Sequence, residues 1–347
     1  MMNFSNSLIH WYLANKRDLP WRNTKNPYNI WLSEIILQQT KVNQGLPYYF
    51  KFIQKFPTIF SLAKAPEEEV LKLWQGLGYY SRARNLHFSA QYIVNELNGE
   101  FPVTYNELLK LKGVGDYTAS AIASICNNEK TAVVDGNVYR LLARYFGIFI
   151  AINSSKGIKE FKLLAQNLID SENPGNFNQA VMEFGATVCT PKKPKCSDCI
   201  LRDSCFALSK NEVEKLPVKE KKTKIKTRYF NYLVFKTSTN KTVLEQRTSG
   251  IWKNLYQFPL IETTEEIDEN KLINHKEFLK ICNSENQTIK LFNNIVKPHK
   301  LSHQHIYAKF WIVKTNDSNK ISYSWETIKK YPVPLLIDNF INEFINF

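Results

Sequence analysis

Four of the six cysteines lie within one short segment, and their spacing constrains the chain more than any other feature. They are Cys189, Cys196, Cys199 and Cys205, in the pattern C-x6-C-x2-C-x5-C. Clustered thiols in an intracellular chain indicate a metal site before they indicate disulfides. Most structural zinc sites use two C-x-x-C pairs and this segment has one, whereas four thiolates can also hold a [4Fe–4S] cluster. The spacing predicts a metal site and leaves the metal open.

Length and charge set the broad class. A chain of 347 residues exceeds what one hydrophobic core usually serves, which predicts two domains. The net charge of +14 favours a polyanionic partner, because bound phosphates release counterions; a generally basic composition is the alternative. Met1 to Pro20 contains no apolar run of signal-peptide length, and no later stretch is long and apolar enough to cross a bilayer. We therefore expect a cytoplasmic protein without a membrane partner.

The character of the sequence changes once along the chain. Apolar spacing is mostly helical from Ile30 to about Leu208, whereas β-branched and aromatic runs follow from Tyr229 onwards. Between them, Lys215 to Arg228 holds seven basic residues and one acidic residue, which is typical of a linker. We predict a multidomain chain with an all-α domain at 1–210, a basic linker at 211–228 and an α+β domain at 229–347.

Two short motifs in the helical region suggest contacts with a ligand. Gly113 and Gly115 flank one apolar residue, which allows a tight turn and a close approach of the backbone, and a helix is expected to start at about Asp116. The free N–H groups of that helix can meet a phosphate oxygen, although an ordinary helix end closed by glycine is the alternative. Downstream, Asp135 follows an apolar run and precedes Gly136. It can cap the next helix or face a cleft.

These motifs together resemble a known superfamily. A glycine hairpin, an Asp-Gly-Asn segment and the four-cysteine pattern, in that order, resemble the helix-hairpin-helix DNA glycosylases over residues 8–208. The resemblance implies an all-α glycosylase domain, a hairpin that grips the DNA backbone through Gly113 and Gly115, and a [4Fe–4S] cluster rather than zinc. It also suggests that the cluster holds Lys192, Lys193 and Lys195 toward DNA.

Further segments resemble the adenine DNA glycosylase branch, the MutY family. They are Leu19-Pro20-Trp21-Arg22, Trp31 to Thr40 and Gly76 to Leu86. This resemblance implies removal of adenine opposite 8-oxoguanine or guanine in double-stranded DNA by an enzyme that acts as a monomer and is associated with the nucleoid. The alternative is an endonuclease III-like enzyme that acts on oxidised pyrimidines through a lysine Schiff base. Tyr117 stands where that lysine would be, so we expect a monofunctional glycosylase.

The resemblance also implies residue roles. Glu34 aligns with the general acid that protonates adenine, and Asp135 is expected to stay ionised and stabilise the cationic sugar. Tyr117 and Asn137 match positions beside this centre. Gln38 and Tyr79 match positions that wedge into the base stack. Glu183 matches a position that can hydrogen-bond the extruded base.

The C-terminal region resembles the Nudix-like domain of the same family. Ser249 to Pro259 carries this resemblance, and the glutamate pattern that binds magnesium in Nudix hydrolases is missing after it, so we do not expect nucleotide hydrolysis. The family uses this domain to recognise oxidised guanine. Ser302 and His303 keep groups that can hydrogen-bond the lesion, whereas Leu301 replaces an aromatic residue of the family pattern.

Overall fold

The computed structural model describes residues 4–220, 225–282, 288–293, 297–315 and 322–345. Contacts divide the chain into two compact units. The first, which we call the helical unit, contains Met1–Lys64 and Asn85–Lys221; the second, the mixed unit, contains Ala65–Arg84 and Lys222–Phe347. Each unit is described by itself. No helix in the described part of the chain is long and apolar enough to span a membrane.

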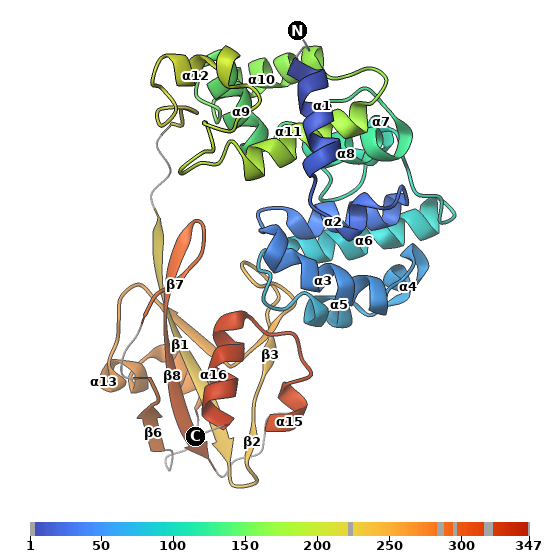
Figure 1. Cartoon of the computed structure of the whole chain (residues 1–347). Helices are drawn as coiled ribbons and strands as arrows, with labels where there is room; N and C mark the ends of the chain where they lie inside the picture. Colours follow the sequence, from blue (N-terminus) through green and yellow to red (C-terminus); the bar gives the residue numbers. More distant parts are fainter. Residues whose placement is uncertain (1–3, 221–224, 283–287, 294–296, 316–321, 346–347) are drawn as a thin grey trace. The chain divides into compact units, whose positions relative to one another are not determined.

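The helical unit contains all the helices before the cysteine segment except one (Figure 1). Its elements are α1 (Phe4–Asn15), η1 (Pro20–Arg22), α2 (Pro27–Leu37), α3 (Val42–Lys55), α4 (Ile59–Lys64), most of α6 (Ser81–Glu96), α7 (Tyr105–Leu108), α8 (Asp116–Asn127), α9 (Gly136–Phe146), α10 (Ser155–Leu168), α11 (Pro174–Thr187), η2 (Arg202–Ser204) and α12 (Phe206–Ser209).

Local sequence signals start the two helices that matter most for the site. The side chain of Asn26 accepts a hydrogen bond from the Tyr28 amide and Pro27 occupies the first turn, so α2 begins there. Asp135 caps α9 by accepting from two backbone amides. Gly147, with φ 69°, ends α9 in the left-handed conformation that glycine adopts without strain.

A polar side chain at the centre of the helical unit organises its core. Asn178 on α11 has no exposed surface. Its amide donates to Ser124 Oγ at 2.9 Å and to the Thr131 carbonyl at 2.8 Å, and its carbonyl accepts from the Val133 amide at 3.1 Å. Asn178 thereby holds the extended stretch that leads from α8 to Asp135.

The mixed unit consists of a sheet, short hairpins and covering helices. Its elements are α5 (Glu67–Leu73), β1 (Lys226–Thr237), β2 (Lys241–Thr242), β3 (Glu245–Gln246), β4 (Tyr256–Gln257), β5 (Leu260–Thr263), α13 (Glu269–Ile273), α14 (Lys276–Ile281), β6 (Thr288–Leu291), β7 (His299–Lys300), β8 (Gln304–Thr315), β9 (Tyr323–Ser324), α15 (Trp325–Ile328) and α16 (Leu335–Ile345).

The main sheet is buried on both faces. Its order is β5-β1-β8-β6, with β7 also paired to β8; β1 and β8 run parallel, and the other pairs are antiparallel. Side chains alternate across β1, so Tyr232 packs with Phe340 of α16 on one face and Leu233 packs with Phe278 of α14 on the other. Figure 1 shows α16 lying over the β1–β8 pair.

The predicted order of a helical region followed by an α+β region is confirmed by these elements. The structure also adds detail to the segment predicted as a linker. Leu216 is buried in the helical unit, and the Ile152 amide donates to the Val218 carbonyl at 3.0 Å, whereas β1 already begins at Lys226. Residues 221–224 lie outside the described residues.

The Asn178 network predicts a stability effect. We expect Asn178→Ala to lower the free energy of unfolding by about 3 kcal/mol, because it leaves the Val133 amide and the Thr131 carbonyl buried without this partner. Chemical denaturation measures the change. Asn15→Ala is the matched control, since its side chain donates to the Trp11 carbonyl at an exposed position. Equal effects of the two substitutions would contradict this account.

Candidate active site and cysteine cluster

A cleft of about 1110 Å³ in the helical unit brings together the predicted catalytic residues. Its lining includes all four of them, Glu34, Tyr117, Asp135 and Asn137, together with Gln38, Gly115 and Glu183. Glu34, Tyr117, Asn137 and Glu183 lie on α2, α8, α9 and α11. Gln38 directly follows α2, and Gly115 and Asp135 directly precede α8 and α9. These polar side chains share the cleft with apolar side chains such as Leu37 and Ile125.

Glu34 lies at the buried end of this polar group. Only 9% of its surface is exposed, on the inner side of α2. Burial raises the pKa of Glu34 to about 7, and the nearby Asp135 carboxylate adds to this, whereas a hydrogen bond with Tyr117 and the charge of Arg22 oppose it. A carboxyl group with this pKa can carry a proton at neutral pH and release it to a bound molecule.

Asp135 is the second carboxyl group, and its surroundings differ. One oxygen accepts from the Asn137 and Val138 amides at 2.9 and 2.8 Å, and the other accepts from Asn137 Nδ2 at 2.7 Å. Burial raises the pKa of Asp135, while these three hydrogen bonds and the charge of Arg140 act against that rise. Because all three bonds favour the ionised form, the arrangement suits a carboxylate that keeps its charge.

Tyr117 links Glu34 to α11. Its hydroxyl hydrogen-bonds Glu34 and lies 3.0 Å from Met182 Sδ. Burial raises the pKa of Tyr117 well above 10, and both carboxyl groups reinforce this shift. The hydroxyl therefore stays protonated and serves as a fixed donor.

Glu183 does not stand alone in the cleft wall. It is 1% exposed, and its Oε1 accepts from Arg17 Nε at 2.7 Å and from the Arg17 amide at 3.2 Å. Its Oε2 accepts from Arg17 Nη2 and Arg22 Nη2, both at 2.7 Å. Burial opposes the charge, but the two guanidinium groups outweigh it and lower the pKa of Glu183 to about 2. Neither arginine is predicted as a site residue from the sequence, although Arg22 belongs to the Leu19-Pro20-Trp21-Arg22 motif.

Gln38 and its neighbour Gln39 face different partners. Gln38 Nε2 donates to the Gly113 carbonyl at 3.1 Å and to Thr118 Oγ1 at 3.3 Å, which ties α2 to the glycine hairpin. Gln39 is exposed, lines the cleft and has φ 55°, a conformation that non-glycine residues seldom adopt. Gln39, to which the sequence motifs gave no role, therefore places an exposed amide at the cleft.

The glycine hairpin has the expected geometry. Gly113 has φ 82°, and an added Cβ would lie 3.0 Å from Asn85 Cβ, so both conformation and space favour glycine there. Gly115 is the residue before α8 and has open space beside it. The Asp116 carboxylate is held by Tyr105 and by Lys162, whose Nζ lies 2.9 Å from Oδ2. The first-turn amides of α8 therefore face outward without a competing side-chain cap.

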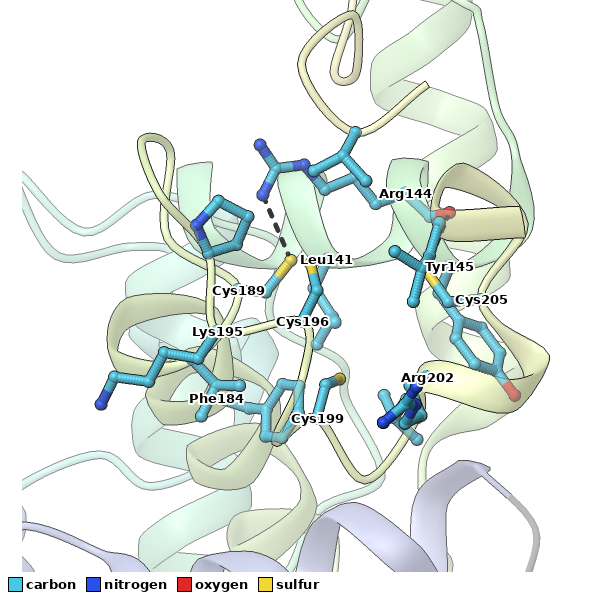
Figure 2. A pocket seen from close by; sticks show the side chains of 15 residues that line it. Leu141, Arg144, Tyr145, Phe184, Cys189, Lys195, Cys196, Cys199, Arg202 and Cys205 are labelled. Carbon is cyan, nitrogen blue, oxygen red and sulfur yellow. Dashed lines mark hydrogen bonds between the residues drawn. The ribbon is translucent and has the colours of Figure 1, made fainter. Parts of the chain in front are cut away.

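The four predicted metal ligands line one pocket (Figure 2). Cys189 follows α11, and Cys196, Cys199 and Cys205 follow in the loops before α12. Within the described ranges, no three His, Cys, Asp or Glu side chains are arranged to hold a single metal ion. Four cysteines at one pocket can supply the four thiolates of a [4Fe–4S] cluster, in which each thiolate binds a different iron atom. Burial raises the pKa of the Cys199 thiol to about 11.

Arg140 lies between this pocket and Asp135. Its Nη2 donates to Asn137 Oδ1 at 2.9 Å and to the Gly185 carbonyl, and its Nε donates to the Cys189 carbonyl at 2.6 Å. Asn137 in turn holds Asp135. One turn further along α9, Arg144 donates to Cys189 Sγ at 3.4 Å and to the carbonyls of Thr190 and Leu216. The Arg140 side chain thus joins the cysteine segment to Asn137 and Asp135, whereas the Arg144 side chain donates to Cys189, Thr190 and Leu216.

The remaining predicted residues lie in the mixed unit. Tyr79 is 44% exposed, with φ 49° and the Arg82 guanidinium 5.6 Å from its ring centre. Ser302 and His303 form the exposed turn between β7 and β8, closed by the Leu301 amide donating to the Gln304 carbonyl at 2.8 Å. Leu301 itself packs against the core of the unit. At the position where the family pattern has an aromatic residue, this chain therefore has a leucine that packs against the core.

Three known protein families match parts of this chain. Residues 32–165 match the HhH-GPD superfamily of base excision DNA repair proteins, residues 189–205 match the iron-sulfur binding domain of endonuclease III, and residues 231–343 match the NUDIX domain. The fold and the sites thus define a helix-hairpin-helix DNA glycosylase with a Nudix-like domain. Its four cysteines hold a [4Fe–4S] cluster.

Similar proteins narrow this class. The chain is 38% identical over 283 residues to the adenine DNA glycosylase of Buchnera aphidicola subsp. Schizaphis graminum. The alignment covers 80% of this chain and 82% of that protein. It is 47% identical over 222 residues to the human adenine DNA glycosylase, covering 61% of this chain and 41% of the human protein. The structure of a thermostable thymine-DNA glycosylase superposes with a TM-score of 0.55 at 32% identity, covering 60% of this chain and 95% of that chain. The chain belongs to the adenine DNA glycosylase family.

The two arginines of α9 generate a paired prediction. We expect Arg140→Lys to lower the single-turnover rate of base excision at least about tenfold per iron-containing chain, because lysine lacks the planar fork that holds Asn137 and Cys189 together. Arg144→Lys should lower the iron content and leave the rate per iron-containing chain near the wild-type value. Iron analysis with rapid-quench kinetics measures both quantities. The same effect from both variants would argue against a separate role for Arg140.

Proposed function

We propose that the chain hydrolyses the N-glycosidic bond of adenine paired with 8-oxoguanine or guanine in double-stranded DNA and leaves the strand uncut. One observation carries the chemistry: a buried carboxyl group with a pKa of about 7, Glu34, lies in one cleft with a carboxylate, Asp135, that accepts three hydrogen bonds. Family membership supports adenine as the base that leaves.

The substrate base must leave the duplex before it can reach Glu34. The outward amides of α8 beside Gly115 can bind a phosphate oxygen, and the exposed Lys192, Lys193 and Lys195 follow Cys189 in the cluster segment. Gln39 lies at the cleft with an exposed amide, so we assign it a contact with the opened duplex. Gln38 instead supports the hairpin through Gly113.

The extruded base would meet a polar wall formed by Glu183, Arg17 and Arg22. Each oxygen of Glu183 already accepts two donors. A direct hydrogen bond from an adenine N–H to Glu183 therefore requires one of these bonds to open. We infer that Glu183 first of all fixes the two guanidinium groups, which shape the cleft around the base.

Adenine is a poor leaving group as an anion. A proton from Glu34 to a nitrogen of its five-membered ring lets adenine depart neutral and leaves an oxocarbenium-like sugar. The ionised Asp135 stabilises that positive charge, and water completes the hydrolysis. Tyr117 holds Glu34 by its hydroxyl, and Asn137 holds Asp135. Since Tyr117 offers no amine, the Schiff-base route of strand cleavage has no nucleophile at this position.

The mixed unit supplies the proposed recognition of oxidised guanine. Ser302 and His303 are exposed in a tight turn, where their polar groups can reach a lesion or its phosphate. Tyr79 is assigned to the neighbouring base stack. We further propose that the chain acts on DNA as a monomer, in the cytoplasm and associated with the nucleoid.

The decisive experiment is single-turnover cleavage of a duplex that carries adenine opposite 8-oxoguanine. Strand breaks should appear only after alkali treatment, and Glu34→Gln should lower the rate at least about 100-fold, since an amide cannot supply the proton. Glu96→Gln is the control, because Glu96 is exposed on α6. Strand cleavage without alkali at an oxidised pyrimidine would instead favour the endonuclease III-like alternative, and no adenine release would refute the proposal.

The pKa of Glu34 predicts the pH dependence. Because the protonated form is the active one, the single-turnover rate should fall as the pH rises through about 7. The Tyr117 hydrogen bond lowers the pKa of Glu34, so Tyr117→Phe should move this fall to higher pH. A rate that increases through pH 7, or a fall that moves to lower pH in Tyr117→Phe, would contradict the assignment of Glu34 as the acid.

A further inference from the structure

Residues 65–84 lie within the sequence of the helical region but belong by their contacts to the mixed unit. This segment contains α5, the loop of residues 76–79 and the start of α6. Two stretches of the C-terminal part contact it, residues 253–256 and residues 331–333. The first stretch is part of the Ser249–Pro259 motif, for which the proposed chemistry provides no role.

The loop of residues 76–79 has an uncommon backbone. Gly76, Gly78 and Tyr79 all have positive φ, at 100°, 74° and 49°. Within the segment, Trp74 Nε1 donates to the Gly78 carbonyl at 3.0 Å, and the Arg82 guanidinium donates to the same carbonyl at 3.2 Å. A bulky residue such as Tyr79 keeps a left-handed conformation only where its surroundings enforce it.

The backbone of Val333 forms hydrogen bonds with the residues on both sides of the loop of residues 76–79. The Val333 amide donates to Gln75 Oε1 at 3.2 Å, and the Tyr80 hydroxyl donates to the Val333 carbonyl at 3.3 Å. Gln75 and Tyr80 directly flank residues 76–79. Val333 is 1% exposed and lies between Pro332 and Pro334, whose rings restrict the backbone on both sides. This peptide is therefore a rigid support.

The 253–254 stretch holds the outer ends of the same segment. Asn254 Nδ2 donates to Glu67 Oε1 at 2.6 Å at the start of α5, and Arg84 Nη1 donates to the Lys253 carbonyl at 2.9 Å. The preceding residue, Trp252, packs edge-on against His299 of β7, with ring centres 5.9 Å apart. β7 continues into the turn of Ser302 and His303. One short motif thus touches both the Tyr79 segment and the base of the proposed lesion-recognition turn.

We propose that Tyr80 and Gln75, held by the Val333 peptide, are positioning residues that fix Tyr79 for its contact with the base stack. The C-terminal part of the chain then has a second task besides recognition through Ser302 and His303: it supports the loop that carries Tyr79. The preference for 8-oxoguanine over guanine becomes a joint property of both elements. This inference rests on the proposed role of Tyr79.

The test is a double-mutant cycle on the ratio of single-turnover excision rates opposite 8-oxoguanine and opposite guanine. Tyr80→Phe keeps the ring and removes the hydrogen bond to Val333, so it should lower this ratio at least about threefold, the size of one hydrogen bond. In a Tyr79→Ala background, Tyr80→Phe should change the ratio no further. Equal effects of Tyr80→Phe in both backgrounds, or a wild-type ratio in the folded Tyr80→Phe variant, would overturn the proposal.

A matched control separates this role from the general loss of a buried hydrogen bond. The Tyr28 hydroxyl donates to the Phe56 carbonyl at 2.6 Å in the helical unit, so Tyr28→Phe removes a bond of the same kind away from the segment. Tyr28→Phe should leave the ratio unchanged. A fall in the ratio as large as that of Tyr80→Phe would refute a specific role for Tyr80.

Hydrogen exchange provides a readout that does not depend on activity. In the full chain, the amides of residues 76–79 should exchange faster in Tyr80→Phe than in the wild type and stay unchanged in Tyr28→Phe. If the wild type released no adenine, the proposed function would be refuted. The hydrogen exchange of these amides would then be the test of whether Tyr80 positions the loop. Unchanged exchange of these amides in Tyr80→Phe would overturn it.

Discussion

The cap that Asp135 forms on α9 is the interaction on which the active site depends. The same carboxylate that satisfies the first amides of the helix faces the cleft, so the catalytic geometry is set by helix formation itself. Asn137, the second residue of the helix, completes the hydrogen bonds, and Arg140 ties Asn137 to the cysteine segment. Hydrolysis has no redox step, but on this proposal the cluster can still matter for catalysis. It holds the cysteine segment, to which Arg140 and Asn137 connect Asp135 by hydrogen bonds.

Three carboxyl groups in one cleft have three different protonation behaviours, and their partners explain the differences. Glu34 is buried with one hydroxyl partner, and its pKa is about 7. Glu183 is also buried but has two guanidinium partners, and its pKa is about 2. Asp135 accepts three hydrogen bonds from Asn137 and Val138. The acid, the charge stabiliser and the structural anchor that we propose are thus all carboxyl groups, which differ in their surroundings.

The division into two units changes how the C-terminal part is understood. Residues 65–84 pack with the sheet-containing part of the chain, where Val333 and Asn254 hold them. An exposed Tyr79 with positive φ is thereby mounted on the same body as Ser302 and His303. We assign the turn of Ser302 and His303 to the lesion and Tyr79 to the neighbouring base stack. Because both lie in the mixed unit, recognition of the lesion is coupled to the placement of Tyr79 in the duplex.

The sequence by itself determined the fold class, the cysteine ligands and the glycosylase family, because spacing, glycine pattern and local caps are properties of short segments. The helix start at Asp116 and the cap by Asp135 were predictable for the same reason. Only the tertiary structure decided the pairing of Glu183 with Arg17, since these residues are far apart in sequence and no local pattern links them. Burial, which sets the pKa of Glu34, likewise depends on how the helices pack, as does the attachment of residues 65–84 to the distant C-terminal part.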